Sequence, residues 1–444
     1  MEKGYWGYGK YDQLRKNIPY SAFAAALRMV IRQLITESSK SLALWKEEIL
    51  RALGSSGAIL TELIPELELI VGAQPQVEAL RPQEAQNRFL LVLEKFLAVF
   101  ASRKKPLVLF LDDLQWANAP ALRLLAKLSA YTNLKYLLIV CAYRDNEITP
   151  RHPLHAMAAE LRKAALPVQE LYLYPLNRKE VTAYLAETLH CSPEKVSLLA
   201  ESVYRKTSGN PFFLGQMLKT MEDEKIIFFD SAKGGWTWKP DAIYRLQMPA
   251  DVLDLLLWRL QKLPRQTLEI LKTASCMGST FDLQILAAVC RKTMPEVQKC
   301  LTSALREGLI SQVAGNQNEF LHDRIEQAVH SLLSEQEAKQ IHLEMGRMIL
   351  QQSAEDSLDE QLPFVLDHIN RSLELIADPG ERLQLARLNF KAGIKAKASA
   401  DYNSALNCLA AGVELLGEGG WQRDYQLCFA LHLQRAACKY MLGN

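Results

Sequence analysis

The chain has 444 residues, of which 49% are hydrophobic and 23% are charged, and its 52 basic and 50 acidic residues leave a formal net charge of +2. The length predicts about three packed domains, and the composition excludes a disordered protein. The charges are mixed along the chain, so they build no extended positive field of the kind that attracts nucleic acid.

The eight cysteines form no CxxC pair and no Cys/His cluster at metal-ligand spacing. The sequence therefore predicts neither a zinc site nor a disulfide framework, and the cysteines are expected to be buried thiols in a reducing cytoplasm. Every apolar run is interrupted by charge before it reaches the length of a membrane span. The N-terminal residues lack the apolar core of a signal peptide, so we expect a cytoplasmic chain.

Residues 1–165 are predicted to form an α/β domain. Apolar residues recur at helical spacing in two stretches of residues 21–53 and again over residues 84–103. Two apolar strands follow, one from Leu107 and one within residues 133–147, with a helix over residues 119–131 between them. Such a strand–helix–strand unit implies a parallel sheet, whose ligands bind at the carboxyl ends of the strands.

Two further features belong to this sheet. The strand within residues 133–147 hardly alternates between apolar and polar residues, which is typical of a strand covered by helices on both faces. The segment "VQELYLYPL", residues 168–176, is a candidate for another strand.

Three helical domains are predicted to follow the sheet. Residues 166–246 are expected to form a small helical lid with a hairpin around Gly234 and Gly235, and residues 247–335 a winged helix with two strands at its end. Residues 336–444 show the small-residue pattern of paired helices in tetratricopeptide-type repeats, with a weakly visible period. The fold class is thus a parallel α/β sheet followed by an all-α lid, a winged helix and helical repeats.

The strand "LVLFLDDLQWA", residues 107–117, ends in two acids. In a nucleotide-binding α/β domain, Asp112 would hold Mg²⁺ through water and Asp113 would polarise the attacking water. The alternative is that both acids cap the helix that follows, a frequent role for aspartate.

A phosphate-binding loop would be needed opposite these acids. Residues 4–11, "GYWGYGKY", match the G-x-x-x-x-G-K part of a Walker A loop. We interpret them as a strand, because Tyr11 has no aliphatic hydroxyl for Mg²⁺, too few residues precede Gly4 to form a strand before the loop, and the aromatic residues favour a strand. No other glycine is followed by Lys-Ser or Lys-Thr, so half of a nucleotide site is expected to be missing.

Three other positions are candidates. Arg144, at the end of the next strand, would lie beside Asp112 and could sense a γ-phosphate; the alternative is a salt bridge to Asp145 or Glu147. Asn210 and Pro211, in "GNPFF", begin a helix and could contact an adenine. His322 could reach a diphosphate, or it could be a packed histidine followed by Asp323 as a helix cap.

Taken together in this order, "LVLFLDDLQWA", "CAYRDNEITPRHPL", "SGNPFFLGQML" and "FLHDRIEQAV" resemble the signal-transduction ATPase (STAND, AAA-type) region of cyanobacterial-type multidomain kinases. "GKYDQLRKNIPYSAF" and "AKASADYNSALNCLAAGVELLGE" flank them in the same order. That family joins a serine/threonine kinase domain to a nucleotide-switch ATPase region, helical repeats, a GAF sensor and often a histidine kinase or cyclase. The resemblance covers essentially the whole chain.

The resemblance implies roles for single residues. It makes Asp112 and Asp113 the Walker B acids and Arg144 the first sensor. It places Pro211 near the base and His322 near the β-phosphate of an ADP-bound state, and it assigns Gly9 and Lys10 to a strand. The first strand and the Walker A loop would precede Met1, so we expect an N-terminally truncated piece of a longer polypeptide, whose kinase and sensor domains would be its partners.

The sequence therefore predicts a nucleotide-switch ATPase module that binds Mg-ATP or ADP in the intact family and binds nucleotide weakly, without ATPase activity, as this chain. Two alternatives stay open. One is a nucleotide-free scaffold whose helical repeats bind a protein, and the other is a winged-helix transcription regulator. Residues 295–309 carry charges of both signs. The transcription regulator, which must contact DNA, is therefore the less favoured alternative.

Overall fold

The computed structural model describes residues 4–12, 20–78, 80, 82–130, 134–150, 152–164, 167–232, 234–240, 252–313, 315–352, 355–398 and 401–442. The chain divides into two compact units. Unit 1 contains residues 1–168 and 337–444, and unit 2 contains residues 169–336. Each unit is described by itself. The predicted division into four domains stays a prediction, and its boundaries at 165/166 and 246/247 lie outside the described residues.

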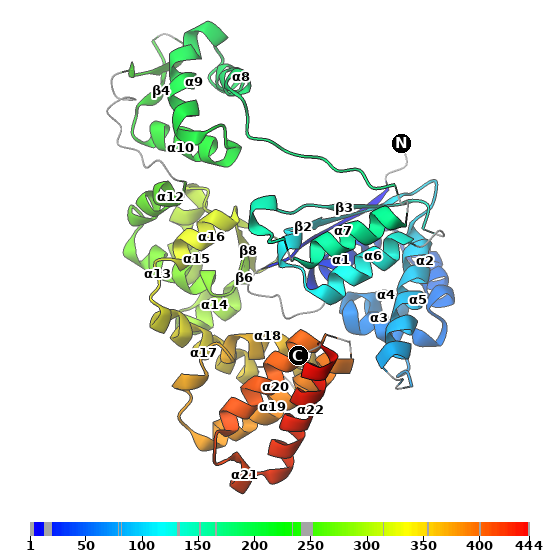
Figure 1. Ribbon diagram of the computed structural model, residues 1–444. Helices are drawn as coiled ribbons and strands as arrows, with labels where there is room; N and C mark the ends of the chain where they lie inside the picture. The colour runs from blue at the N-terminus through cyan, green and yellow to red at the C-terminus, as the bar shows by residue number, and fades with distance from the viewer. Residues whose placement is uncertain are drawn as a thin grey trace. The chain divides into compact units, whose positions relative to one another are not determined.

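The N-terminal part of unit 1 is built on a three-stranded sheet with the order β1-β2-β3 (Figure 1). Both strand pairs are parallel, as the sequence predicts. The elements in chain order are β1 (Tyr5–Lys10), α1 (Ser21–Ile35), α2 (Ser39–Leu53), α3 (Ala58–Leu63), α4 (Glu68–Val71), α5 (Pro82–Phe100), β2 (Leu107–Asp112), α6 (Ala119–Ala130), β3 (Leu137–Cys141) and α7 (Pro153–Lys163). Helix α7 was not predicted from the sequence.

Strand β1 confirms the interpretation of "GYWGYGKY" as a strand. Its alternate residues Tyr5, Gly7 and Gly9 face the core, whereas Trp6 and Tyr8 are exposed. The glycines let α1 approach closely: a Cβ atom at Gly7 would lie 2.2 Å from the carbonyl oxygen of Ala26, and one at Gly9 would lie 1.8 Å from that of Ala22. These glycines therefore serve helix–strand packing.

The sheet buries one face. Leu107, Leu109 and Leu111 of β2 are fully buried in a core that includes side chains of α1, α5 and α6. On the opposite face, Trp6 is 51% exposed and Leu138 is 57% exposed. The expectation of helices on both faces is thus wrong for the residues that the structure describes. The sequence misleads here because both faces of β3 carry apolar residues although only one is covered.

The segment 168–176 is not a strand, contrary to the sequence prediction. Leu171, Leu173 and Tyr174 are more than 80% exposed. Its apolar alternation satisfies the local preference of a strand, but a strand also needs a partner for its backbone groups. In the part of the chain that the structure describes, no strand pairs with it.

The C-terminal part of unit 1 is helical. Its elements are α17 (Glu335–Gln352, which begins in unit 2), α18 (Glu355–Ile369), α19 (Pro379–Ala398), α20 (Tyr402–Leu416), α21 (Gly420–Arg423) and α22 (Tyr425–Met441). Helix α20 packs against α19 and α22. A Cβ atom at Gly393 would lie 2.8 Å from Leu409, and one at Gly412 would lie 2.7 Å from Leu431, so the small residues permit the close packing that the sequence predicts. Assignment to tetratricopeptide-type repeats stays a prediction.

Unit 2 begins with three helices and a hairpin. These elements are α8 (Arg178–Thr188), α9 (Pro193–Thr207), α10 (Pro211–Asp223), β4 (Ile227–Asp230) and β5 (Gly235–Trp238). Asn177 and Glu180 form a capping box at the start of α8. Strands β4 and β5 are antiparallel, so the predicted hairpin is confirmed.

The rest of unit 2 is formed by α12 (Val252–Gln261), α13 (Arg265–Ser275), β6 (Thr280–Asp282), α14 (Leu283–Val289), α15 (Met294–Arg306), β7 (Ile310–Gln312), β8 (Gln317–Phe320) and α16 (Asp323–His330). The two predicted strands β7 and β8 are present, and a third strand, β6, pairs with β8. Strand β6 was not predicted, because its partner β8 is distant in the sequence and no hairpin turn joins the two. Whether this segment is a winged helix stays a prediction.

All eight cysteines are free thiols. The expectation that they are buried holds for only three, Cys276, Cys428 and Cys438, and Cys141 is exposed. Among the described residues, no helix combines the length and the apolar character needed to cross a membrane.

Replacing Gly9 with alanine should destabilise the protein by about 1–3 kcal/mol or more, because the added methyl group meets the backbone of α1. Gly419→Ala is the matched control, since Gly419 is exposed and a Cβ atom there would lie 4.0 Å from its nearest neighbour, Nε of Arg423. Urea denaturation measures both. A Gly9→Ala variant as stable as the control would contradict the packing role of this glycine.

Two aspartates at helix N-caps should respond in opposite ways to the same substitution. Burial raises the pKa of Asp401 at the start of α20. By contrast, hydrogen bonds from the Leu427 backbone and Arg387 lower the pKa of Asp424 at the start of α22. Asparagine caps helices as well as aspartate does. At neutral pH, Asp401→Asn should therefore stabilise the protein and Asp424→Asn should destabilise it.

The sign follows from proton linkage. Above its raised pKa, ionised Asp401 lowers the free energy of unfolding. The stabilisation by Asp401→Asn should therefore shrink as the pH falls towards the ordinary carboxyl range. Asp424 contributes stability above the ordinary carboxyl pKa and loses it at lower pH, so the defect of Asp424→Asn should also shrink. Thermal unfolding from about pH 8 to about pH 4 measures both. Effects of equal sign at neutral pH would refute this account.

Candidate functional site

The carboxyl ends of the three parallel strands bring charged side chains together in unit 1. Register pairs Lys10 with Asp112 and Leu111 with Cys141, so the residues that follow β2 and β3 lie at one edge of the sheet. The backbone extends this pairing past the strands, because the Ala142 N–H donates to the Leu111 carbonyl and the Leu114 N–H donates to the Ala142 carbonyl, both at 2.9 Å. We call Tyr8, Lys10, Asp112, Asp113, Gln115, Arg144 and Glu147 the acid edge.

Asp113 is the buried centre of the acid edge, with 5% of its surface exposed. Its backbone is left-handed, with φ 53°, a conformation that aspartate adopts more readily than most residues. Two cations reach its carboxylate: Lys10 Nζ lies 3.3 Å from Oδ2, and Arg144 Nε lies 3.5 Å from Oδ1. A buried carboxylate needs such compensation, so the pairing explains how this charge is tolerated.

Asp112 lies on the half-exposed face of the sheet. Its Oδ1 accepts the backbone N–H of Asp113 at 2.9 Å, and its Oδ2 accepts the hydroxyl of Tyr8 at 3.2 Å. Burial, followed by the charge of Asp112, raises the pKa of Tyr8, so its hydroxyl keeps the proton that it donates. The alternative that both acids are helix caps is not supported for Asp113, whose side chain makes no cap bond to the 3-10 helix Leu114–Trp116.

Gln115 connects the two loops of the acid edge and was not predicted. Its amide nitrogen donates to Asp113 at 2.9 Å and to Glu147 at 3.3 Å, while its amide oxygen accepts the Arg144 N–H at 3.2 Å. Its own carbonyl lies 3.1 Å from Nε2 of His152, the residue that caps α7 through Nδ1. Because Nδ1 accepts a hydrogen bond, Nε2 carries the proton and donates it to Gln115.

Arg144 forms the salt bridge of the alternative interpretation, and its role as a sensor of a γ-phosphate stays a prediction. Its guanidinium reaches Asp113, and it also pairs with Glu147 at 3.0 Å, as the salt-bridge alternative predicts. Lys10 was predicted as a strand residue with no role in the site. The register of β1 was the missing information, since the sequence does not show that this strand lies next to β2.

The remaining candidates lie in unit 2. Asn210 caps α10 by accepting the Phe213 N–H at 2.9 Å, and Pro211 is the first residue of that helix. His322, rather than the predicted Asp323, caps α16, and its Nδ1 accepts the Arg324 N–H. The ring of Phe212 stacks on that of His322, with centroids 3.9 Å apart. The structure thus groups His322 with Asn210 and Pro211.

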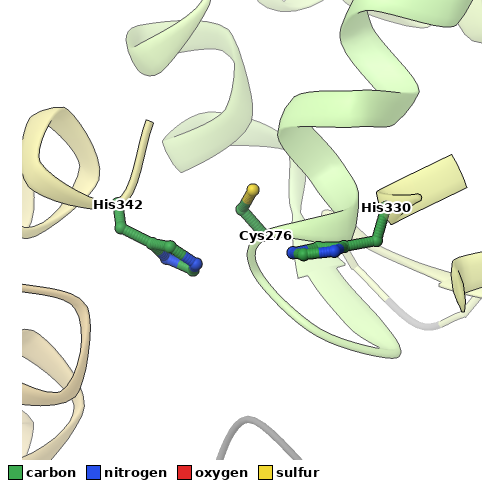
Figure 2. Close-up of side chains that lie close together, drawn as sticks. All are labelled: Cys276, His330 and His342. Atoms are coloured by element: carbon green, nitrogen blue, oxygen red, sulfur yellow. The ribbon is translucent and has the colours of Figure 1, made fainter. Parts of the chain in front are cut away.

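Figure 2 shows Cys276, His330 and His342, which have the ligand types that zinc and other transition metals prefer. Cys276 and His330 belong to unit 2, whereas His342 belongs to unit 1. Because the positions of these parts relative to one another are not determined, we assign no metal site to these residues. The absence of a zinc site stays a prediction from the sequence.

The chain is similar to several known proteins, and its N-terminal region is similar to a known domain family. Residues 2–140 match the AAA ATPase domain family. The chain is 29% identical to the hybrid signal transduction histidine kinase G of Dictyostelium discoideum over 98% of this chain and 16% of that protein. It is 24% identical to the peroxide stress-activated histidine kinase mak3 of Schizosaccharomyces pombe, over 77% of this chain and 16% of that kinase. The chain therefore spans about one sixth of the length of these relatives.

A solved structure is also similar. It is a signal transduction ATPase with numerous domains (STAND) and a tetratricopeptide repeat sensor from Pyrococcus horikoshii, with 13% identity and a TM-score of 0.41 over 98% of this chain and 62% of that one. The match of residues 2–140 is consistent with the expected AAA-type ATPase domain, and the two relatives are histidine kinases. Association with a serine/threonine kinase and truncation before Met1 stay predictions.

Replacing Gln115 with leucine should cost about 1–3 kcal/mol, because Asp113, Glu147 and the Arg144 N–H each lose a partner. Gln351→Leu is the control, since Gln351 is exposed in unit 1 and should change stability by less than about 0.5 kcal/mol. Chemical denaturation compares the two variants. Equal stabilities would show that the Gln115 contacts are not maintained in solution.

Proposed function

We propose that the chain is the nucleotide-switch ATPase region of a signal-transduction protein, with the acid edge as the magnesium side of its nucleotide site. The observation that supports this most directly is the meeting of Asp112, Asp113 and Arg144 at the carboxyl edge of a parallel sheet. Ligands bind at this edge in open α/β sheets. The match of residues 2–140 to an AAA ATPase domain is consistent with it.

The residues of the acid edge fit Mg²⁺ in their chemistry. Carboxylate oxygens are the ligands that Mg²⁺ prefers, and this ion usually keeps several waters, so one carboxylate can hold it through water. Asp112 would hold it in this way, and the bound ion would neutralise charge on the phosphates. Asp113 would orient the attacking water, and Arg144 would contact the γ-phosphate.

In unit 2, we propose that Asn210 and Pro211 lie against the adenine and that His322 reaches the β-phosphate. This proposal is supported by the stack of Phe212 on His322, which holds the candidates of α10 and α16 in one unit. The cap bond at Nδ1 leaves the proton on Nε2, the atom that can donate to a phosphate oxygen. In this proposal residues 247–335 form a winged helix.

The helical C-terminal part of unit 1 would bind protein partners, including the kinase and sensor domains of a longer polypeptide. On α22, Tyr425, Phe429, Leu433 and Tyr440 are all more than 50% exposed and recur at helical spacing. Apolar stripes of this kind are typical of helix–helix contacts. A nucleotide-free scaffold is the second candidate function, and this stripe is the observation that favours it. We place either function in the cytoplasm.

Contact with DNA is not part of the proposal. Helix α15 would be the groove-reading helix of a winged-helix regulator, yet its exposed charges include Glu296 as well as Lys299 and Arg306. Recognition helices present a stripe of basic residues to the phosphates. The transcription-regulator alternative therefore finds no support in the composition of this helix.

We further propose that nucleotide binds weakly to this chain and is not hydrolysed by it. The single Gly-Lys dipeptide of the sequence, Gly9-Lys10, lies inside β1, where its backbone groups pair with β2. Loop amides and a lysine supply most of the partners of the phosphates in P-loop proteins.

Calorimetric titration with Mg-ATP tests the proposal. The dissociation constant for Mg-ATP should lie above the micromolar range. Compared with a titration of ATP without Mg²⁺, the ion should lower the dissociation constant in the wild type and in the control Asp145→Asn, but not in Asp112→Asn. Asp145 is a suitable control because it adjoins the acid edge and its Oδ1 accepts the backbone N–H of Asn146. A micromolar dissociation constant would contradict weak binding, and an equal Mg²⁺ effect in Asp112→Asn would refute the role of Asp112.

A further inference from the structure

Each carboxylate oxygen of the two acids already accepts from a donor of the protein. Asp112 Oδ1 accepts the Asp113 N–H, and Asp112 Oδ2 accepts the Tyr8 hydroxyl. Asp113 Oδ1 is contacted by Gln115 and Arg144, and Asp113 Oδ2 is contacted by Lys10. The oxygens that a cation and its waters would use are therefore engaged within unit 1.

Two of these donors come from one strand. Tyr8 and Lys10 are separated by one residue in β1, so their side chains point to the same face of the sheet. The parallel register sets Tyr8 beside Phe110 and Lys10 beside Asp112, and the ring of Tyr8 stacks on that of Phe110 at 5.8 Å. Gly7 and Gly9, which alternate with them, fix the opposite face of β1 against α1. The strand is thus held with both donors directed at the acids.

Lys10 and Tyr8 are suited to leave the acids when a cation arrives. The side chain of Lys10 is 27% exposed, against 7% for that of Asp113, and Tyr8 is 40% exposed. Lysine is a flexible point charge with four side-chain methylene groups, so its ammonium can move into water without movement of the strand. By contrast, Gln115 and Asp113 are buried and have no such freedom.

We propose that Tyr8 and Lys10 form a displaceable lock on the acid edge: they occupy Asp112 and Asp113 in the absence of a divalent cation, and the cation must displace them to bind. This inference rests on the proposed function, since it concerns the regulation of the same site. Lys10 opposes the cation by its charge and by its contact with Asp113, and Tyr8 opposes it by its hydrogen bond to Asp112. The lock keeps the acid edge neutralised until the cation takes over that role.

Binding of Mn²⁺ to the full chain, followed by the electron paramagnetic resonance signal of the free ion, tests the lock. Lys10→Met should tighten Mn²⁺ binding about three- to tenfold, because one positive charge beside the ion is removed. Tyr8→Phe should tighten it about two- to fivefold, because one competing hydrogen bond is removed. Lys10→Arg keeps the charge and should change the affinity by less than about twofold.

Lys104→Met is the control for net charge. Lys104 is exposed and precedes β2, so it lies near the opposite edge of the sheet from Asp112. It should leave Mn²⁺ binding unchanged. If Mn²⁺ binds and Lys10→Met does not tighten it, the lock is wrong and the proposed site survives. If no variant binds Mn²⁺, both the proposed site and the lock are wrong.

A second measurement detects the contact without any metal. The stabilities of Lys10→Met, Asp113→Asn and the double variant form a double-mutant cycle, which isolates the interaction of the two side chains. The lock requires a favourable coupling that corresponds to at least about a threefold change in the unfolding equilibrium constant. Additive effects would show that Lys10 does not hold Asp113 in solution and would overturn the proposal.

Discussion

The buried carboxylate of Asp113 constrains the acid edge more than any other group in unit 1. A charge with 5% exposure is stable only beside opposite charge and hydrogen-bond donors. Each of the three strands supplies one of its partners. Lys10 belongs to β1, Gln115 to the turn after β2, and Arg144 to the loop after β3. The parallel register of the whole sheet is therefore needed to stabilise the charge of this one side chain.

Strand β1 shows how one short sequence meets two requirements at once. Alternation separates its residues into two faces: Gly7 and Gly9 allow the backbone of α1 to approach, and Tyr8 and Lys10 reach the acids. A larger residue at either glycine would displace α1 or β1. Displacement of β1 would also move the two donors, Tyr8 and Lys10, away from the acids. The sequence "GYGK" thus resembles a phosphate loop only in composition. Its glycines serve packing, and its lysine pairs with a carboxylate.

Much of the fold follows from local patterns. The strands at Leu107 and Leu137 and the hairpin at Gly234 and Gly235 are signalled by apolar runs and turn residues, and the structure has them. The segment 168–176 shows the limit of such patterns. Its alternation favours a strand, but pairing depends on a distant neighbour, and no described strand provides one. Strand β6 was missed because its partner β8 is distant in the sequence. Helix α7 was missed although Pro153 in its first turn is a helix-start signal.

The site was predictable in part. Two acids after an apolar strand and an arginine after the next one share an edge in any parallel sheet, so Asp112, Asp113 and Arg144 could be chosen from the sequence. Gln115 and Lys10 could not, because their roles depend on distances of 2.9 Å and 3.3 Å that follow from the turn at Asp113 and from the register of β1. The stack of Phe212 on His322 likewise joins residues that are distant in the sequence.

The central claim is that the acid edge receives a divalent cation and is more than a structural group of ion pairs. Paramagnetic broadening by Mn²⁺ in methyl NMR spectra tests it most directly. Leu111 and Leu114 flank the two acids, and Leu107 lies at the far end of the same strand. The account predicts selective broadening of Leu111 and Leu114 that is lost in Asp112→Asn. The account would be contradicted if the methyl signals of Leu111 and Leu114 were not broadened, or if they were still broadened in Asp112→Asn.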